Sequence, residues 1–109
     1  MALTQIEQFA FGGNRAHFVT AFEVYAECVT LRLKPVESDA TLRETIVRFP
    51  SARMLNDWTD ANEQTQWPLD IIGFDCYPRL ERWKFVLNCG TKEWIWESNW
   101  PTLEAPPAR

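Results

Sequence analysis

The segment 82–98 constrains the fold most, because polar and apolar residues alternate on both sides of a Gly-Thr pair. Alternation with a period of two is typical of a half-buried strand. A two-residue turn at Gly90-Thr91, with glycine at positive φ, predicts a β-hairpin and fixes its register. The expected cross-strand pairs are Lys84 with Glu97, Phe85 with Trp96, Val86 with Ile95, Leu87 with Trp94, and Asn88 with Glu93.

A third strand is expected over Leu69 to Tyr77, joined to the hairpin by a four-residue loop at 78–81. That loop would place Phe74 opposite Phe85 and gather large apolar side chains on one face, as in a core wall. The expected members are Ile72, Phe74, Cys76, Trp83, Phe85, Leu87, Cys89, Trp94 and Trp96. The other face carries Ile71, Val86 and Ile95 among charged residues, so we expect the helix, the first hairpin or a second copy to cover it. A homodimer is therefore possible.

The first half of the chain predicts a further strand pair. Residues 27–34 alternate up to Pro35, and Thr41 to Phe49 reads as the returning strand, which Pro50 ends. Residues 14–25 fit a helical stripe or a strand, and we favour a strand from about Phe18.

Three segments are less regular. Leu3 to Phe11 is a short helix or a strand, and its two phenylalanines favour the strand. Ser51 to Glu63 is the best helix candidate, with an irregular crossover as the alternative. The proline-rich tail, residues 101–109, is expected to fray. The sequence thus predicts one α+β, β-rich domain over residues 1–100, with a mostly antiparallel sheet of five or six strands and one short helix or crossover.

Composition excludes several functions. A net charge of −4 and the lack of a basic cluster argue against nucleic acid. No apolar run approaches the roughly 18 residues of a membrane span. Three scattered cysteines, Cys28, Cys76 and Cys89, and the lack of a secretion signal indicate a reduced, cytoplasmic protein.

The chain offers little chemistry for catalysis. His17 is its only histidine, and no ligand spacing matches a metal site, so we expect no metal and no cofactor. Glu93 and Glu97 share a strand face and are the best candidates for a carboxylate pair. A solvated face with cross-strand ion pairs explains them more simply, so we expect no enzyme.

An acidic, tryptophan-bearing segment is the best candidate for a binding site. Residues 54–78 contain no lysine or arginine, and such a segment can steer and anchor a basic protein. A solvated acidic loop is the alternative. The candidate partner-binding residues are Asp57, Trp58, Asp60, Glu63, Trp67 and Asp70. A second possibility is a small-ligand or carbohydrate binder that uses Trp58, Trp67 or Trp100.

The order of elements resembles that of small bacterial immunity proteins of polymorphic toxin systems and their uncharacterised relatives. The resemblance rests on Thr45-Ile46-Val47-Arg48-Phe49 and on Arg82-Trp83-Lys84-Phe85-Val86-Leu87, and covers about two-thirds of the chain. The chain departs from the pattern where Phe18 follows His17, in place of a His-Asp pair. The resemblance implies a cytoplasmic protein that binds and blocks a toxin domain.

Overall fold

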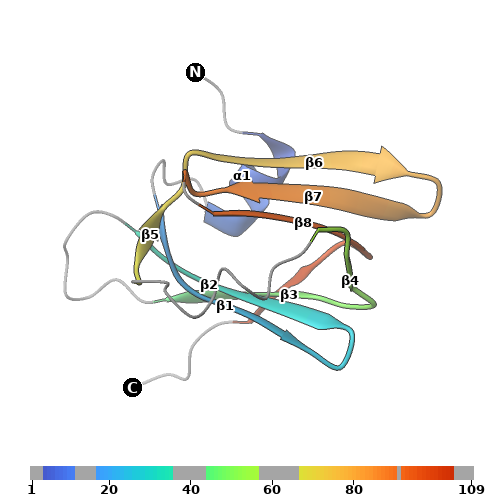
Figure 1. Cartoon of the computed structure of the whole chain (residues 1–109), viewed down its shortest axis with the longest axis horizontal. Coiled ribbons are helices and arrows are strands. Elements are labelled where there is room, and N and C mark those ends of the chain that lie inside the picture. The colour runs from blue at the N-terminus through green and yellow to red at the C-terminus, as the bar shows by residue number, and fades with distance from the viewer. Residues whose placement is uncertain (1–3, 12–16, 36–43, 57–66, 91, 105–109) are drawn as a thin grey trace.

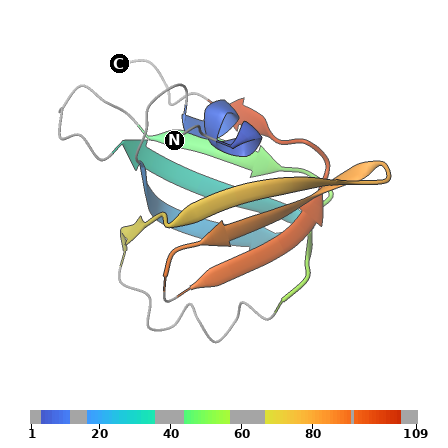
Figure 2. The same ribbon diagram turned by 90° about the horizontal axis from the view of Figure 1, so that it is seen from above.

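The computed structural model describes residues 4–11, 17–35, 44–56, 67–90 and 92–104. Over these residues two antiparallel sheets face each other, with one short helix, α1 (Gln5–Phe11), beside them (Figures 1 and 2). The β-rich α+β class is confirmed. The strands, however, are divided between two sheets and do not form the single sheet of five or six that the sequence predicted.

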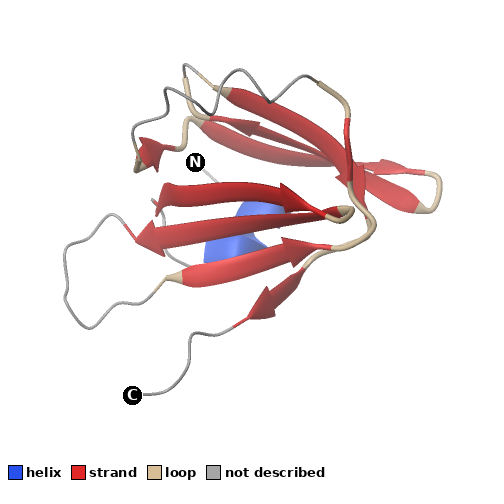
Figure 3. Ribbon diagram, turned by 60° about the horizontal axis from the view of Figure 1, so that its bottom comes forward, coloured by secondary structure: helices blue, strands red, loops and turns tan. Residues whose placement is uncertain are grey.

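The two sheets are named A and B. Sheet A has the spatial order β5 (Leu69–Asp70), β1 (His17–Tyr25), β2 (Cys28–Pro35), β3 (Thr45–Phe49) and β9 (Thr102–Glu104) (Figure 3). Sheet B has the order β4 (Arg53–Met54), β8 (Glu93–Ser98), β7 (Arg82–Asn88) and β6 (Gly73–Arg79). No helix among the described residues is long and apolar enough to cross a membrane.

Aromatic side chains join the two sheets. Phe22 of sheet A stacks on Trp94 of sheet B, with ring centroids 4.4 Å apart. Phe49 meets Phe85 and Trp96 edge-on, at 4.8 and 5.0 Å. Offset-stacked and edge-to-face pairs are the favourable aromatic geometries, and all these rings are buried. The predicted face of Phe74, Phe85, Leu87, Trp94 and Trp96 is therefore the inner face of sheet B.

The β7–β8 hairpin has the predicted register. All five predicted pairs occur, from Lys84 with Glu97 to Asn88 with Glu93. Gly90 has a φ of 84°, and the Cys89 N–H donates to the Lys92 carbonyl at 2.8 Å. Thr91 lies outside the described residues. Alternation together with a glycine at positive φ was sufficient to specify this hairpin.

The β6–β7 connection differs from its prediction. The turn contains only Leu80 and Glu81, so Phe74 pairs with Leu87 and Cys76 with Phe85. The predicted four-residue loop was wrong, and the register is shifted by two residues. Because side chains alternate with a period of two, that shift leaves the same residues on the inner face.

Leu69 to Tyr77 is not one strand. Leu69 and Asp70 form β5 and pair with β1, after which the chain crosses to sheet B and begins β6 at Gly73. Ile72 lies at this crossing and is 69% exposed, so its assignment to the core was wrong. Ile71 packs against the core although it was assigned to the outer face. Alternation does not reveal where a strand changes sheets.

Sheet A confirms the predicted strand pair. β1 begins at His17, and Val29, Leu31 and Leu33 of β2 are fully buried. β3 ends at Phe49, before Pro50, as predicted, and residues 41–43 lie outside the described ranges. The outer face of this sheet is polar, with ion pairs between Arg32 and Glu44 and between Arg48 and Glu104.

The N-terminal segment is a helix, so the preference for a strand was wrong. The Thr4 N–H donates to the Glu7 carboxylate at 2.9 Å, and the Glu7 N–H donates to the Thr4 hydroxyl at 3.2 Å. This reciprocal pair is a capping box, which stabilises a helix start. Phe9 meets Trp100 edge-on at 5.4 Å, and Phe11 stacks on His17 at 4.4 Å. The phenylalanines thus dock the helix.

Two further expectations fail where the structure describes them: the helix from Ser51, for which an irregular crossover was the alternative, and the fraying of the whole tail. Ser51 has a φ of 54° and Arg53–Met54 form β4 against β8, so no helix begins at Ser51, while residues 57–63 lie outside the description. Thr102–Glu104, expected to fray, form β9 against β3. Residues 105–109 lie outside the described part of the chain.

Candidate partner-binding surface

The structure describes two of the six candidate partner-binding residues. Asp57, Trp58, Asp60 and Glu63 lie outside the described ranges, so their predicted role stays a prediction. Trp67 and Asp70 are described: Trp67 lies two residues before β5, and Asp70 is the last residue of β5.

Trp67 is an exposed ring supported by a buried one. Its ring lies parallel to that of Trp94, with centroids 6.2 Å apart and planes 9° apart. Trp94 is fully buried, whereas Trp67 is 37% exposed. One side of Trp67 therefore contacts the core, and the remainder faces solvent in a fixed orientation. A rigid aromatic surface of this kind loses little side-chain entropy when a partner covers it.

Asp70 and Ile72 are two further exposed residues of the same connection. Asp70 is exposed on the edge strand β5, and Ile72 is 69% exposed. The Ile72 N–H donates to the Asn88 carbonyl at 2.8 Å, which places Ile72 beside the β7–β8 turn. We call Trp67, Asp70 and Ile72 the β5 corner. Sequence reasoning missed Ile72, because the alternation of 69–77 assigned it to the core.

Asp70 also acts on a neighbouring buried thiol. Burial, and secondly the negative charge of Asp70, raise the pKa of Cys89 to about 12. The Cys89 side chain is only 7% exposed. A thiol with so high a pKa stays protonated and is a poor nucleophile, which agrees with the structural role predicted for it.

The other tryptophans and carboxylates that the structure describes show no comparable arrangement. Trp100 is half-buried and packs edge-on against Trp83 at 4.8 Å, so it is no free platform. The Glu97 carboxylate pairs with Arg53 at 3.3 Å and with Arg79 at 3.9 Å. Within the described ranges, no three potential metal ligands come together.

The long edge strand β6 is poorly suited to pairing with a partner's strand. Thr4 donates its hydroxyl to the Phe74 carbonyl at 2.6 Å, so α1 covers the first part of this edge. Pro78, further along β6, has no N–H to offer. Both features are known protections of edge strands. At the β6 edge, a partner is therefore more readily recognised by side chains than by added strands.

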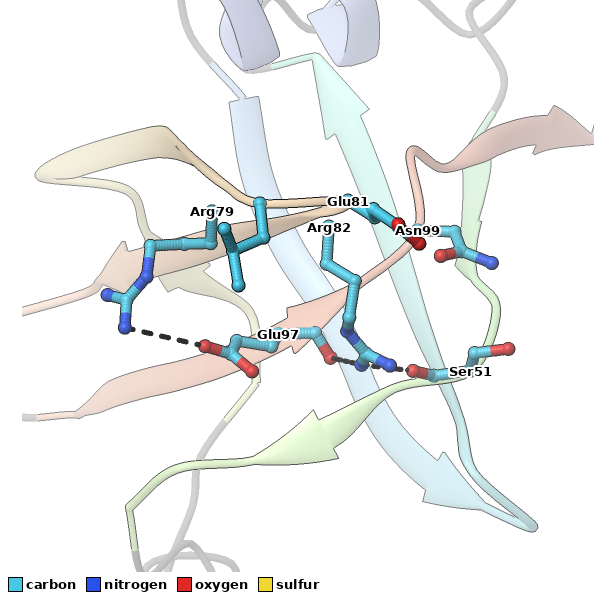
Figure 4. Close-up of a pocket in the computed structure, with 7 residues that line it drawn as sticks. Ser51, Arg79, Glu81, Arg82, Glu97 and Asn99 are labelled. Atoms are coloured by element: carbon cyan, nitrogen blue, oxygen red, sulfur yellow. Dashed lines mark hydrogen bonds and ion pairs between the residues drawn. The ribbon is translucent and has the colours of Figure 1, made fainter.

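A shallow hollow of about 790 Å³ lies at the opposite end of sheet B from the β5 corner, and it includes Arg79 and Arg82 (Figure 4). Sequence reasoning missed it, because arginines beside a hairpin turn ordinarily indicate only a solvated loop. None of the residues that line it is a tryptophan.

Comparisons of the chain with family models, with curated proteins and with solved structures found no match.

Proposed function

We propose that this protein is a non-catalytic binding module that recognises a protein partner through the β5 corner. The observation that carries the proposal is the parallel stack of Trp67 on Trp94, which holds an exposed indole in place. Tryptophan is among the residues that contribute most binding energy at protein interfaces, particularly in a preorganised position. Ile72, 69% exposed on the other side of β5, adds exposed apolar area to the same connection.

The partner that fits this surface is basic. Asp70 is exposed within the corner, and the chain carries a net charge of −4. Residues 54–78 contain no lysine or arginine, so the segment that carries the corner contributes no positive charge of its own. Complementary charge mainly accelerates association and selects among partners, while the buried aromatic contact supplies the affinity.

The resemblance to immunity proteins suggests a particular partner, a toxin domain, and a cytoplasmic site of action. The three cysteines are free thiols, which is compatible with a reducing compartment. A gene for a toxin-like protein beside the gene for this chain would support this more specific proposal. Co-expression of the two proteins should then restore growth, and growth arrest despite co-expression would contradict it.

The proposal is tested by affinity capture from the native lysate with wild-type protein and two variants. Asp70→Lys should lose the captured partner, because it places a positive charge in the corner. Tyr25→Ala is the matched control, since Tyr25, the last residue of β1, is 83% exposed and lies outside the corner. Equal retention by Asp70→Lys, or equal loss by Tyr25→Ala, would contradict the proposal.

A small-ligand or carbohydrate binder is the second candidate, favoured by the solvent-facing part of Trp67. Aromatic rings can stack on the apolar faces of sugars. A sugar that quenches tryptophan fluorescence saturably in the wild type but not in Trp67→Ala would favour this alternative over the protein partner.

A further inference from the structure

The outer face of sheet B is covered by no helix or strand that the structure describes. Sheet A packs against the inner face, and α1 contacts β6 and β3 at the side of the two sheets (Figures 1 and 2). The helix and the first hairpin, two of the three coverings expected from the sequence, therefore do not lie over this face. A second copy of the chain is the third.

An apolar row crosses the middle of this face. Val86 of β7 pairs with Ile95 of β8, and the N–H of Leu55, the residue after β4, donates to the Ile95 carbonyl at 2.7 Å. Leu55 is 41% exposed, and Val86 and Ile95 are half-buried. Adjacent apolar side chains on an uncovered sheet face gain free energy when a second surface excludes water from them.

One end of the face, beside the β6–β7 turn, is basic. Arg53 and Arg79 share the Glu97 carboxylate, at 3.3 and 3.9 Å (Figure 4). The Glu97 side chain is only 14% exposed, whereas the two arginines are 72% and 55% exposed, so solvent meets mainly the cations. With the turn included, this end has a net charge of +2, from four cations and two carboxylates: Arg53, Arg79, Arg82 and Lys84 against Glu81 and Glu97.

The other end of the face, beside the β7–β8 turn, is acidic. Glu93 is exposed and pairs across the sheet with the neutral Asn88. The Asp75 carboxylate leans toward this end, because its Oδ2 lies 3.9 Å from the position that a Cβ on Gly73 would occupy. Lys92 precedes Glu93 and by alternation belongs to the inner side of the sheet. The two carboxylates balance the basic end, so the described residues of this face carry no net charge.

We propose that the outer face of sheet B binds a second copy of this chain about a two-fold axis that runs across the strands, along the apolar row. Rotation about that axis reverses the strand direction, so the basic end of each copy faces the acidic end of the other. The apolar rows of the two copies meet between these ends. A partner of uniform charge fits less well, because one end of the face would repel it.

The size of the face predicts a weak dimer. Four strands at a spacing of about 4.8 Å, and the seven residues of β7 at a rise of about 3.3 Å, span roughly 19 by 23 Å. This area, roughly 440 Å² on each copy, is below the roughly 800 Å² per partner of a standard interface. We therefore expect a dissociation constant in the micromolar range, on the order of 100 μM.

Sedimentation equilibrium of the intact chain, at concentrations from about 10 μM to about 1 mM, tests the proposal. The average mass of the wild type should rise from that of a monomer toward that of a dimer. Val86→Lys should remain monomeric over the same range, because it places a charge in the apolar row. Denaturant unfolding verifies that this variant is folded.

A pair of charge reversals tests the direction of the axis. Glu93→Lys and Lys84→Glu should each weaken self-association about tenfold, because like charges then face each other twice in the dimer. An equimolar mixture of the two variants should associate about as strongly as the wild type, since each supplies the charges that the other lacks. Glu23→Lys is the matched control, because Glu23 is exposed on β1 in sheet A, and it should not change the association.

Four results would overturn the proposal. The first is a wild type that stays monomeric at about 1 mM, and the second is a Val86→Lys variant that is folded and dimerises as the wild type does. The third is equal weakening by Glu23→Lys, which would show general repulsion between charges, and the fourth is a mixture that does not associate. If the wild type is monomeric but Val86→Lys loses a captured partner, a different protein occupies this face, which contradicts a second copy.

Discussion

The indole of Trp67 lies parallel to the indole of Trp94, 6.2 Å from it, although the first belongs to the connection before β5 and the second to the interior of β8. The two residues connect the surface of the molecule to its core. Trp94 in turn stacks on Phe22 of sheet A, so the exposed ring rests on a series of stacked aromatic rings. The buried core therefore supports the exposed Trp67 ring of the β5 corner.

Trp67→Ala should lower the free energy of unfolding only moderately, by about 1–2 kcal/mol. The variant loses an aromatic pair and part of its buried area, but the fully buried rings around Trp94 remain in place. Denaturant unfolding followed by circular dichroism provides the measurement. A loss as large as that of a core truncation, about 3–5 kcal/mol, would show that Trp67 belongs to the core and not to a surface.

Thr4→Ala should destabilise the protein by about 1–2 kcal/mol. The Thr4 hydroxyl accepts the Glu7 N–H and donates to the Phe74 carbonyl, so the variant loses both a helix cap and a bond to the β6 edge. Gln5→Ala is the control, because Gln5 is exposed in the same helix. The two variants are compared by denaturant unfolding, and equal stabilities would contradict the role given to Thr4.

Stability should fall as the pH drops below about 6.5, because of His17. Burial lowers the pKa of His17 below 6.5 in the folded protein, while the unfolded chain keeps the ordinary value. Between these two pKa values the unfolded state binds more protons, so the free energy of unfolding rises with pH in this range. The gain in stability from neutral His17 is fully present above about pH 6.5. Denaturant unfolding at a series of pH values measures the effect. His17→Phe should remove this component, and an unchanged pH profile in that variant would contradict it.

Cys89 should resist alkylation in the folded protein. Its pKa is raised to about 12 and its side chain is buried, so little thiolate exists near pH 8. Iodoacetamide treatment followed by peptide mass spectrometry should show Cys28, which is only half-buried, modified before Cys89. Modification of Cys89 at the same rate would mean that the core opens at that end.

The sequence predicts local pairing well and the assembly of the two sheets poorly. The β7–β8 register follows from alternation and from Gly90 alone, both of which are local. The shifted β6–β7 turn has no such signal, because Leu80 adopts positive φ without being a typical residue for that conformation. The crossing at Ile72 depends on contacts between sheets, which a periodic pattern does not encode.

The sequence contains a signal for the helix α1, which the prediction of a strand over this segment missed. Thr4 and Glu7 have the spacing of a capping box, which predicts the start of a helix, whereas the alternation of Phe9 and Phe11 favours a strand. The candidate site could be predicted only in part. Trp67 and Asp70 were identified from composition, whereas Ile72 joined them only once the change of sheets was known.

The dissociation constant between the captured partner and the Trp67→Ala variant tests binding through the β5 corner most directly. The purified partner is titrated by calorimetry into wild-type protein, Trp67→Ala and the control Tyr25→Ala. Truncation of a central tryptophan anchor costs about 2 kcal/mol or more, so the dissociation constant should rise about thirtyfold for Trp67→Ala and stay within about twofold for Tyr25→Ala. A dissociation constant that is the same for Trp67→Ala as for the wild type would contradict binding through the β5 corner.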